Sequence, residues 1–471
     1  MSTPPPPPGA APPPPPPPGA NSRSSSSPGA NSRSSSSPGA GPPHPAATSP
    51  SSPAPGVGQR PSPTARADRE PILDLLRGFA LLGILLVNIE LMRGPALFDA
   101  LAGILPEPAS DADRITGFLV GWLASGKFIS SFAILFGVGA GLLAAKARSR
   151  GWSPQRLLAR RYTLLAIFGL AHMLLLFPGD VLFVYAVTGF ALLLFVEVQP
   201  RTALGWAGGI IALLTAATTA LVALAAAFGD LIPDTEVEDP FSTAMGGFFD
   251  GRREAAVAAY TDGSLGEILS ARAFEALLVQ SGTLVTVPWL LALFLLGFAA
   301  TRAGFATDLA GHRQLLRRLA AVGLLVGLPA NLVLGMVGPV GAATGTTGEL
   351  ELTWVELAAA PVQLVAAPLL AVGYLAGLSL LALRFGAWRP LAAVGQMALT
   401  AYLAQSLVTT VVFIGFGTYG AWTATSALVV VAGTWLLLLV ACPLWLRWLR
   451  FGPVEWLWRC WTYRAWQPLR R

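Results

Sequence analysis

The chain has 471 residues, of which 54% are hydrophobic and only 12% are charged, and its formal net charge is +6 at pH 7. A soluble protein of this length needs more charge to cover its surface. Apolar runs of about twenty residues recur along the chain, which predicts an all-α protein that crosses a membrane several times. Three histidines and two cysteines are too few for a zinc framework. The basic excess fits membrane topology, so we expect neither a metal site nor a nucleic-acid partner.

Residues 1–68 are mostly Pro, Gly, Ala and Ser, and the decapeptide GANSRSSSSP occurs twice there, at 19–28 and 29–38. Proline runs favour the extended polyproline II conformation, and the serine-rich stretches cannot bury a core, so a disordered cytosolic tail is predicted. No apolar run precedes residue 71, so no signal peptide is expected. The tail is either passive or a ligand for proline-reading modules. Residues 69–471 are predicted to form one membrane domain.

About ten apolar runs follow that are long enough to cross a membrane. The predicted spans are 72–92, 128–146, 162–178, 180–199, 203–228, 283–302, 319–340, 355–384, 391–416 and 425–447. Arginine-rich segments precede the first span and follow the second, sixth, eighth and tenth, so the positive-inside rule places both termini in the cytosol. Residues 229–282 would form the largest external loop, with a short surface helix at GRREAAVAAY. The short run 115–125 either lies at the interface or extends the second span.

The first span, LDLLRGFALLGILLVNIE, carries Asp74, Arg77 and Asn88 among apolar residues. Asp74 and Arg77 are three residues apart, so they neighbour each other on one helical face. Asn88 follows after three further turns, roughly 16 Å of rise, and lies on nearly the same face. This face is predicted to contact substrate. The alternatives are an ion pair at the cytosolic interface for Asp74 and Arg77, and a helix–helix hydrogen bond for Asn88.

The third and fourth spans form a tight hairpin that concentrates ionisable residues. His172 lies roughly 9 Å below the outer turn, Asp180 lies in that turn, and Tyr185 returns to a similar depth. Ionisable residues within spans are functional candidates, so His172 is predicted to be a general base that Asp180 or Tyr185 orients. We expect His172 to border a water-accessible cavity that opens outward, with Asn88 or Lys127 in its walls. The alternative is a structural hydrogen bond across the hairpin.

Polar residues of the second and ninth spans complete the candidate substrate-binding set. Lys127 begins the second span on the outer side, where it either contacts an anion or extends its ammonium group to the interface. In the ninth span, Tyr402 and Gln405 either line a pathway or make helix–helix hydrogen bonds. The C-terminal FGPVEWLWRCWTY places tryptophans beside arginines, a pattern typical of anchoring at the cytosolic interface.

Several motifs together resemble one bacterial family. They are LDLLRGFALLGILLVNI, GKFISSFAILFGVGAGL (126–142), GLAHMLLLFPGDVLFVYAVTG (169–189), GQMALTAYLAQS (395–406) and RFGPVEWLWRCWTY (450–463). Over residues 69 to the end, the chain resembles the YeiB-like membrane proteins, the domain-of-unknown-function family numbered 418. The chain departs from the family pattern at Gln396 and Ala401, where a basic residue and an amide are expected. Its first motif also resembles transmembrane acyltransferases, although Asn88 stands where the polysaccharide-modifying enzymes have a histidine.

The resemblance implies a multi-pass protein of the bacterial inner membrane that transfers an acyl group from a cytosolic donor to an external acceptor. The donor would be of the acyl-CoA type, with no tightly bound cofactor, and Arg77 would contact its phosphate or pantetheine groups. The first alternative is a small-molecule or lipid transporter, or a flippase, in which the same residues line the route. The second is a membrane scaffold whose tail recruits a partner. The lipid bilayer is the one partner expected in every case.

Overall fold

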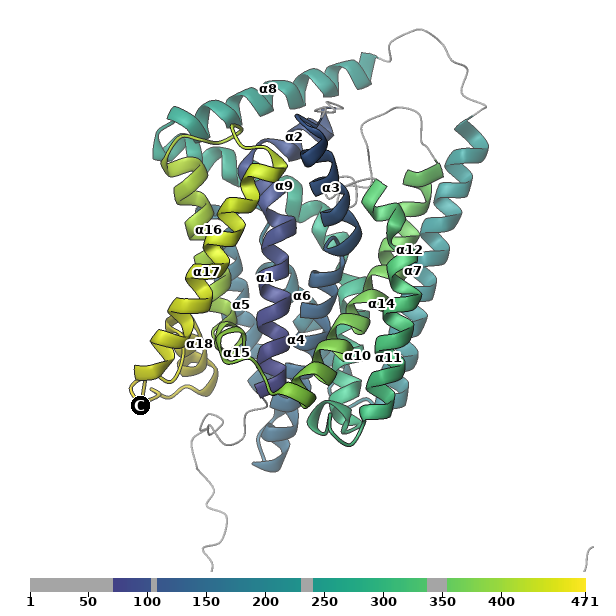
Figure 1. The fold of residues 1–471 in the computed structure, drawn as a ribbon, viewed down its shortest axis with the longest axis vertical. Coiled ribbons are helices and arrows are strands. Elements are labelled where there is room, and N and C mark those ends of the chain that lie inside the picture. The colour runs from purple at the N-terminus through teal and green to yellow at the C-terminus, as the bar shows by residue number, and fades with distance from the viewer. Residues whose placement is uncertain (1–70, 103–107, 230–239, 337–353) are drawn as a thin grey trace, which may run out of the picture. The chain divides into compact units, whose positions relative to one another are not determined.

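The computed structural model describes residues 71–102, 108–229, 240–336 and 354–471. All named elements in these ranges are helices. They form eight helical segments that are long and apolar enough to cross a membrane, one of which joins α3 to α4 and another α16 to η4. Two shorter apolar helices, Leu182–Phe195 and Val287–Arg302, accompany them. The prediction of an all-α polytopic membrane protein is therefore confirmed (Figure 1). The predicted tail, 1–68, lies outside the described residues.

The first half of the chain runs from the central helix α1 to the surface helix α8. Its elements are α1 (Pro71–Arg93), α2 (Ala96–Leu101), α3 (Asp111–Leu123), α4 (Lys127–Ser149), α5 (Pro154–Leu175), α6 (Leu182–Leu192), η2 (Leu193–Phe195), α7 (Pro200–Gly229) and α8 (Pro240–Asp262). The predicted run 115–125 belongs to α3, and Gly126 turns the chain into α4 at a φ of 78°, which glycine adopts without strain. Of the two alternatives for residues 115–125, the structure therefore shows the second, in which the run extends the second span.

The second half of the chain contains more broken helices. Its elements are α9 (Leu265–Val285), α10 (Val287–Arg302), η3 (Phe305–Thr307), α11 (Arg313–Leu325), α12 (Gly327–Ala330), α14 (Trp354–Phe385), α15 (Arg389–Gln396), α16 (Ala398–Thr410), the π turn η4 (Val411–Gly415), α17 (Ala424–Trp448) and α18 (Pro453–Tyr463). The ninth predicted span is interrupted at Met397, where α15 ends and α16 begins. This break matters for function, because it leaves the first N–H groups of α16 in need of a partner.

One part of the sequence prediction is wrong. Residues 229–282 were expected to be an external loop, but α9 occupies Leu265–Val285 and is itself long and apolar enough to span. The helix was not predicted because its polar residues Arg272, Glu275 and Gln280 interrupt the apolar run. All three side chains are buried against protein. The expected surface helix at GRREAAVAAY is present within α8.

Glycines allow the central helices to approach backbone to backbone. A Cβ atom added at Gly395 of α15 would lie 1.8 Å from the carbonyl oxygen of Asp74 in α1. A Cβ at Gly137 of α4 would lie 2.0 Å from the carbonyl oxygen of Phe294 in α10. Such contacts give membrane helices their packing energy, since burial from water contributes little inside a bilayer. They fix α1, α4, α10 and α15 as a rigid frame for the site.

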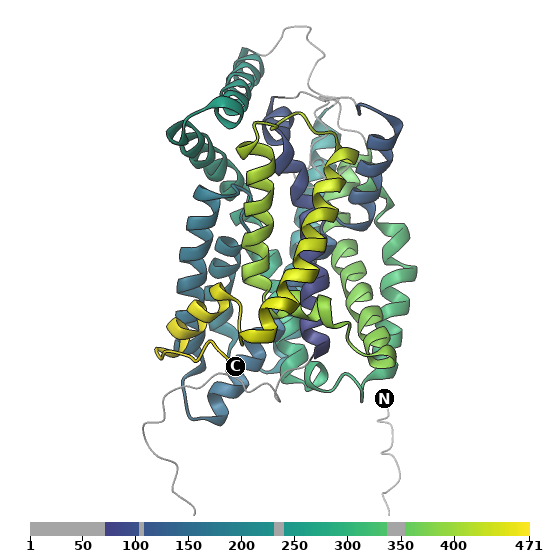
Figure 2. The same cartoon turned by 60° about the vertical axis from the view of Figure 1, so that its left-hand side comes forward.

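The bundle has two distinct ends. The start of α1, the C-terminal residues and the α4–α5 connection lie at one end, whereas α8 lies across the other (Figures 1 and 2). We call these the inner and outer ends, after the orientation that the arginine-rich segments predict. The clustering of the first described helix start and the C-terminus at one end fits an even number of crossings.

Candidate functional site

A cavity of about 760 Å³ extends into the bundle from the inner end, with walls from α1, α4, α5, α6, α15, α16 and α18. Ser149 and Arg150, which are exposed, form part of its rim. Farther in, the walls are largely apolar and include Leu81, Phe132 and Leu165. The cavity therefore combines a polar mouth with an apolar interior, the arrangement suited to an amphiphilic ligand.

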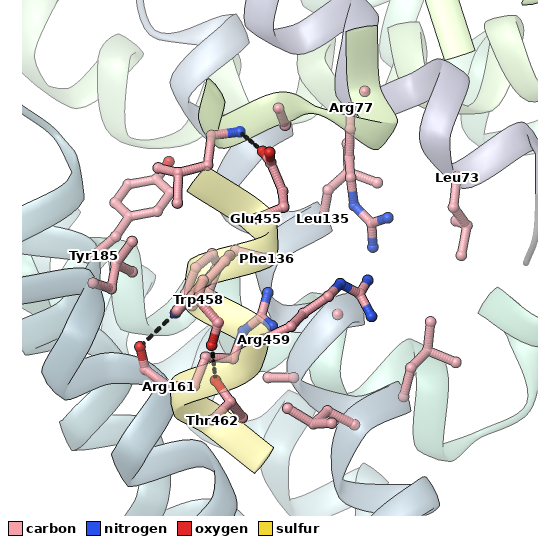
Figure 3. A pocket seen from close by; sticks show the side chains of 18 of the residues that line it. Leu73, Arg77, Leu135, Phe136, Arg161, Tyr185, Glu455, Trp458, Arg459 and Thr462 are labelled. Carbon is pink, nitrogen blue, oxygen red and sulfur yellow. Dashed lines mark hydrogen bonds between the residues drawn. The ribbon is translucent and has the colours of Figure 1, made fainter. Parts of the chain in front are cut away.

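Asp74 and Arg77 lie in the mouth of the cavity, as Figure 3 shows for Arg77. Arg77 Nη1 donates a hydrogen bond of 2.9 Å to Asp74 Oδ1, across three residues of α1. The two side chains keep 27% and 15% of their surface exposed, so the pair is neither fully exposed nor sealed in protein. Arg77 thus has donor groups to spare after its bond to Asp74.

The C-terminal helix α18 forms one wall of the mouth. Sequence analysis predicted only an interfacial anchor here, but Glu455, Trp458 and Arg459 face the cavity (Figure 3). Other aromatic side chains of the segment do remain on the surface, with Trp461 48% exposed. Anchoring is therefore only part of the predicted role of this segment, because one face of α18 lines the cavity.

Glu455 caps the broken ninth span. Its carboxylate accepts hydrogen bonds from the backbone N–H groups of Leu399 and Thr400, at 2.6 and 2.9 Å, and from the Thr400 hydroxyl. Burial raises the pKa of the Glu455 carboxyl, while these hydrogen bonds act in the opposite direction. The Glu455 carboxyl group is therefore bonded to the N-terminus of α16, where the helix dipole favours negative charge.

Two further arginines complete the mouth, and sequence analysis missed both. The guanidinium carbon of Arg161 lies 3.5 Å from the centre of the Trp458 ring, and Trp458 Nε1 donates to the Arg161 carbonyl at 2.8 Å. The guanidinium of Arg459 lies 4.6 Å from the Phe451 ring centre, and burial lowers the pKa of this group. The sequence feature that could have indicated Arg161 was the Arg-Arg pair before the third predicted span. This pair was used only to assign the membrane topology.

Tyr185 and Tyr402 line the deep part of the cavity. Tyr185 Oη donates to the carbonyl of Ile129 at 2.9 Å, so it does not serve as the expected orienting partner of His172. The Tyr402 hydroxyl accepts from Val181 N at 3.4 Å, and its ring centre lies 4.9 Å from that of His172. Tyr402 therefore contacts both the cavity and the candidate base.

The structure brings His172 and Asp180 together across the α5–α6 hairpin. His172 Nδ1 and Asp180 Oδ1 are 2.7 Å apart, and both side chains have no exposed surface. Asp180 Oδ2 accepts from Phe183 N at 2.7 Å, which fixes the carboxylate. Among the described residues, His172 Nε2 is buried without a hydrogen-bond partner. An oriented imidazole with one free nitrogen has the geometry that proton transfer requires.

The expected outward-opening cavity at His172 is not found among the residues that the structure describes. His172 is fully buried and does not line the large cavity, and α9 covers the hairpin turn. Gln280 Nε2 donates to the carbonyl of Asp180 at 2.8 Å, and Arg272 Nη1 donates to the carbonyl of Leu175. Residues 265–282 were predicted to belong to a loop, so the packing of α9 over the α5–α6 hairpin turn could not be predicted.

The remaining predicted substrate-binding residues lie apart from the cavity. Lys127 is completely buried and donates to the carbonyl of Gly121 at 2.9 Å, so extension to the interface is excluded. Gln405 is buried and donates to the carbonyl of Leu81 at 3.3 Å, which is the helix–helix hydrogen bond given as its alternative. Asn88 is half-buried on α1 and does not line the cavity. In the described ranges, no three metal-ligating side chains gather.

At the outer end, polar side chains are packed against one another. Asp99 of α2 accepts a 2.5 Å hydrogen bond from Arg253 of α8. Tyr260 of α8 and Arg272 and Glu275 of α9 are buried nearby. Two cavities there have volumes of only about 20 Å³ each, room for about one water molecule. The two cavities beside these polar groups are therefore too small for a substrate.

Comparison with known proteins gives a family and three bacterial relatives. The model of DUF418, described as a protein of unknown function, matches residues 300–465. The chain is 29% identical to the uncharacterized protein YxaH of Bacillus subtilis over 428 residues, which cover 87% of this chain and 98% of YxaH. It is 29% identical to the uncharacterized protein YeiB of Escherichia coli over 424 residues, covering 85% and 98%. The resemblance seen in the sequence motifs is thereby confirmed.

Proposed function

We propose that this chain, which is similar to the DUF418 family and to YeiB-like membrane proteins, transfers an acyl group from a cytosolic acyl-CoA-type donor to an acceptor on the outer side. The observation that carries the proposal is the inner cavity. Its basic mouth suits the phosphates of such a donor, its apolar walls suit an acyl chain, and it ends at Tyr402, on which His172 packs. A scaffold protein has no need of such a cavity.

The proposed reaction assigns a role to each end of the site. Arg77 binds a phosphate of the donor at the mouth, so that the thioester lies in the deep part. His172 Nε2 removes the proton from an acceptor hydroxyl, and the oxygen attacks the thioester carbonyl. The new C–O bond forms, the C–S bond breaks, and the leaving thiolate takes up the proton from the imidazolium. Asp180 stabilises that imidazolium through its contact with Nδ1.

His172 reaches the cavity only if the ring of Tyr402 changes position. The single weak hydrogen bond at the Tyr402 hydroxyl, 3.4 Å from Val181 N, is consistent with such a movement. The acceptor has to enter from the outer end, which requires α9 to move from the hairpin turn. The proposed enzyme is thus in a closed state that keeps water from the thioester.

Transport is the second candidate function, and the sealing of His172 favours it. A transporter that has its cavity open to the inner side would be closed at the outer side, where Gln280 of α9 is bonded to the hairpin turn of this protein. In that case His172 and Asp180 would hold the hairpin together, and no covalent bond of the substrate would change.

The test compares acylation in a deletion strain and in the complemented strain. Acyl transfer predicts that lipid or cell-wall acyl groups are lost on deletion and restored by the wild-type gene. The purified protein in lipid nanodiscs should also release free thiol from acyl-CoA when the acceptor fraction is added. Transport predicts unchanged acylation, no thiol release, and uptake or export of a substrate in sealed vesicles. Unchanged acylation in both settings would overturn the acyltransferase proposal.

A further inference from the structure

Three arginine side chains gather at the mouth of the cavity, and two of them have no hydrogen-bonded carboxylate among the described residues. Arg77, Arg161 and Arg459 direct their guanidinium groups into one region of the cavity, as Figure 3 shows. Among the described residues of the lining, the acidic ones are Asp74 and Glu455. One acidic residue is bonded to Arg77 and the other to the N-terminus of α16. Neither carboxylate is therefore hydrogen-bonded to Arg161 or Arg459.

Arg161 and Arg459 are held by aromatic rings instead of by acids. Arg161 is stacked on Trp458, which is itself tied to α5 through the Arg161 carbonyl. Arg459 is stacked on Phe451. Ring stacking fixes the plane of a guanidinium group while leaving its N–H groups available, and a planar fork of N–H donors matches the oxygens of a phosphate. The two arginines are thus positioned by the fold and keep donors for a ligand.

We propose that Arg161 and Arg459, together with Arg77, form a subsite for a ligand that carries two or more phosphate charges. This inference rests on the proposed function, because it assigns the subsite to the phosphates of the acyl donor. Clustered arginines that lack acidic partners are stabilised by a multivalent anion, and a single neutral headgroup would leave them repelling one another. An anionic lipid headgroup shares this chemistry, but it is anchored in the bilayer, whereas the rim of this cavity is formed by exposed residues at the inner end.

The first measurement is binding of coenzyme A to the full-length protein in phosphatidylcholine nanodiscs, with inorganic pyrophosphate as competitor. Arg161→Gln and Arg459→Gln should each weaken coenzyme A binding by about tenfold or more, the factor for the loss of one charge-assisted hydrogen bond. Arg447→Gln is the matched control, because Arg447 is exposed in the last turn of α17 at the same end. If a Gln variant fails to fold, Arg459→Lys keeps the charge without the fork and should bind with intermediate affinity.

The second measurement compares two donors, acyl-CoA and the corresponding acyl-pantetheine, which lacks the phosphates. The variants should raise KM for acyl-CoA and leave KM for acyl-pantetheine unchanged. Equal binding of coenzyme A by wild type and both Gln variants would overturn the subsite. Displacement of coenzyme A by added phosphatidylglycerol would assign the arginines to a lipid headgroup and overturn the donor assignment.

The outcomes separate this inference from the proposed function. Arginine-dependent binding of coenzyme A without any acyl transfer would keep the subsite and remove the acyltransferase proposal. Acyl transfer with an unchanged KM in Arg161→Gln and Arg459→Gln would keep the reaction and remove the subsite.

Discussion

The two ends of the bundle use buried polar residues in opposite ways. At the inner end, arginines surround a cavity of about 760 Å³ and keep hydrogen-bond donors free. At the outer end, the cavities are about 20 Å³, and Gln280 and Arg253 are bonded to other parts of the protein. Buried polar atoms without a hydrogen-bond partner also occur at the outer end, for example Gln280 Oε1 and Arg272 Nη2. The difference teaches that a polar residue inside a membrane protein indicates function when it faces a space large enough for a ligand. Polarity alone does not separate the two ends.

The largest expected effect concerns the orientation itself, which labelling would show as all or none. In a chain with Cys442 and Cys460 replaced by Ala, a cysteine at Glu254 of α8 should react with a membrane-impermeant maleimide in intact cells. A cysteine at Ser149, at the end of α4, should react only after the membrane is opened. Both positions are exposed in the structure. The opposite labelling pattern would exchange the two ends and break the comparison.

His172→Gln should lower acyl transfer by about 100-fold or more, the usual contribution of a general base, while the protein is expressed at a normal level. Glutamine can retain one hydrogen bond to Asp180 but cannot carry a proton between substrates. His312→Gln is the control, because His312 lies in the connection before α11 and does not line the cavity. Activity of His172→Gln at the wild-type level would show that the hairpin pair is structural.

Arg77→Ala should destabilise the protein by about 1–3 kcal/mol, because it leaves Asp74 partly buried without its partner. Arg114→Ala removes an ion pair of the same spacing, between Arg114 and Asp111. The side chain of Arg114 is 70% exposed and that of Asp111 is 88% exposed. We expect a loss of at most about 0.5 kcal/mol there. Thermal unfolding in detergent measures the loss of stability caused by each substitution. Equal losses would mean that the mouth of the cavity is as solvated as the surface.

Gln280→Ala should have the smallest effect, about 1–2 kcal/mol, because it leaves the buried carbonyl of Asp180 without its donor. The substitution loosens α9 over the hairpin, so the outer end should also become more permeable. Gln314→Ala, at an exposed position of α11, should change nothing measurable. A rise in acyl transfer on Gln280→Ala would sharpen the comparison by identifying α9 as the barrier to the acceptor, whereas unchanged stability would remove α9 from that role.

Local patterns were enough to predict most of the helices, with α9 as an exception, and the contacts within them. Long apolar runs identify spans because backbone groups in a bilayer must be bonded within a helix. The bond between Asp74 and Arg77 follows from a separation of three residues on one helix, and the meeting of His172 and Asp180 follows from a tight hairpin. In each case the sequence separation is short, so the geometry of one element or one turn determines the distance.

Only the tertiary structure decided what lies in the cavity and what is sealed. Trp458 bonds to the carbonyl of Arg161 across 297 residues of sequence, and Gln280 bonds to Asp180 across 100. No periodicity within one helix specifies such contacts, because the packing of all helices sets which faces meet. For this reason the sequence alone identified Arg77 and His172, whereas the arginine pair of α5 and α18, and the cover that α9 forms over the candidate base, required the fold.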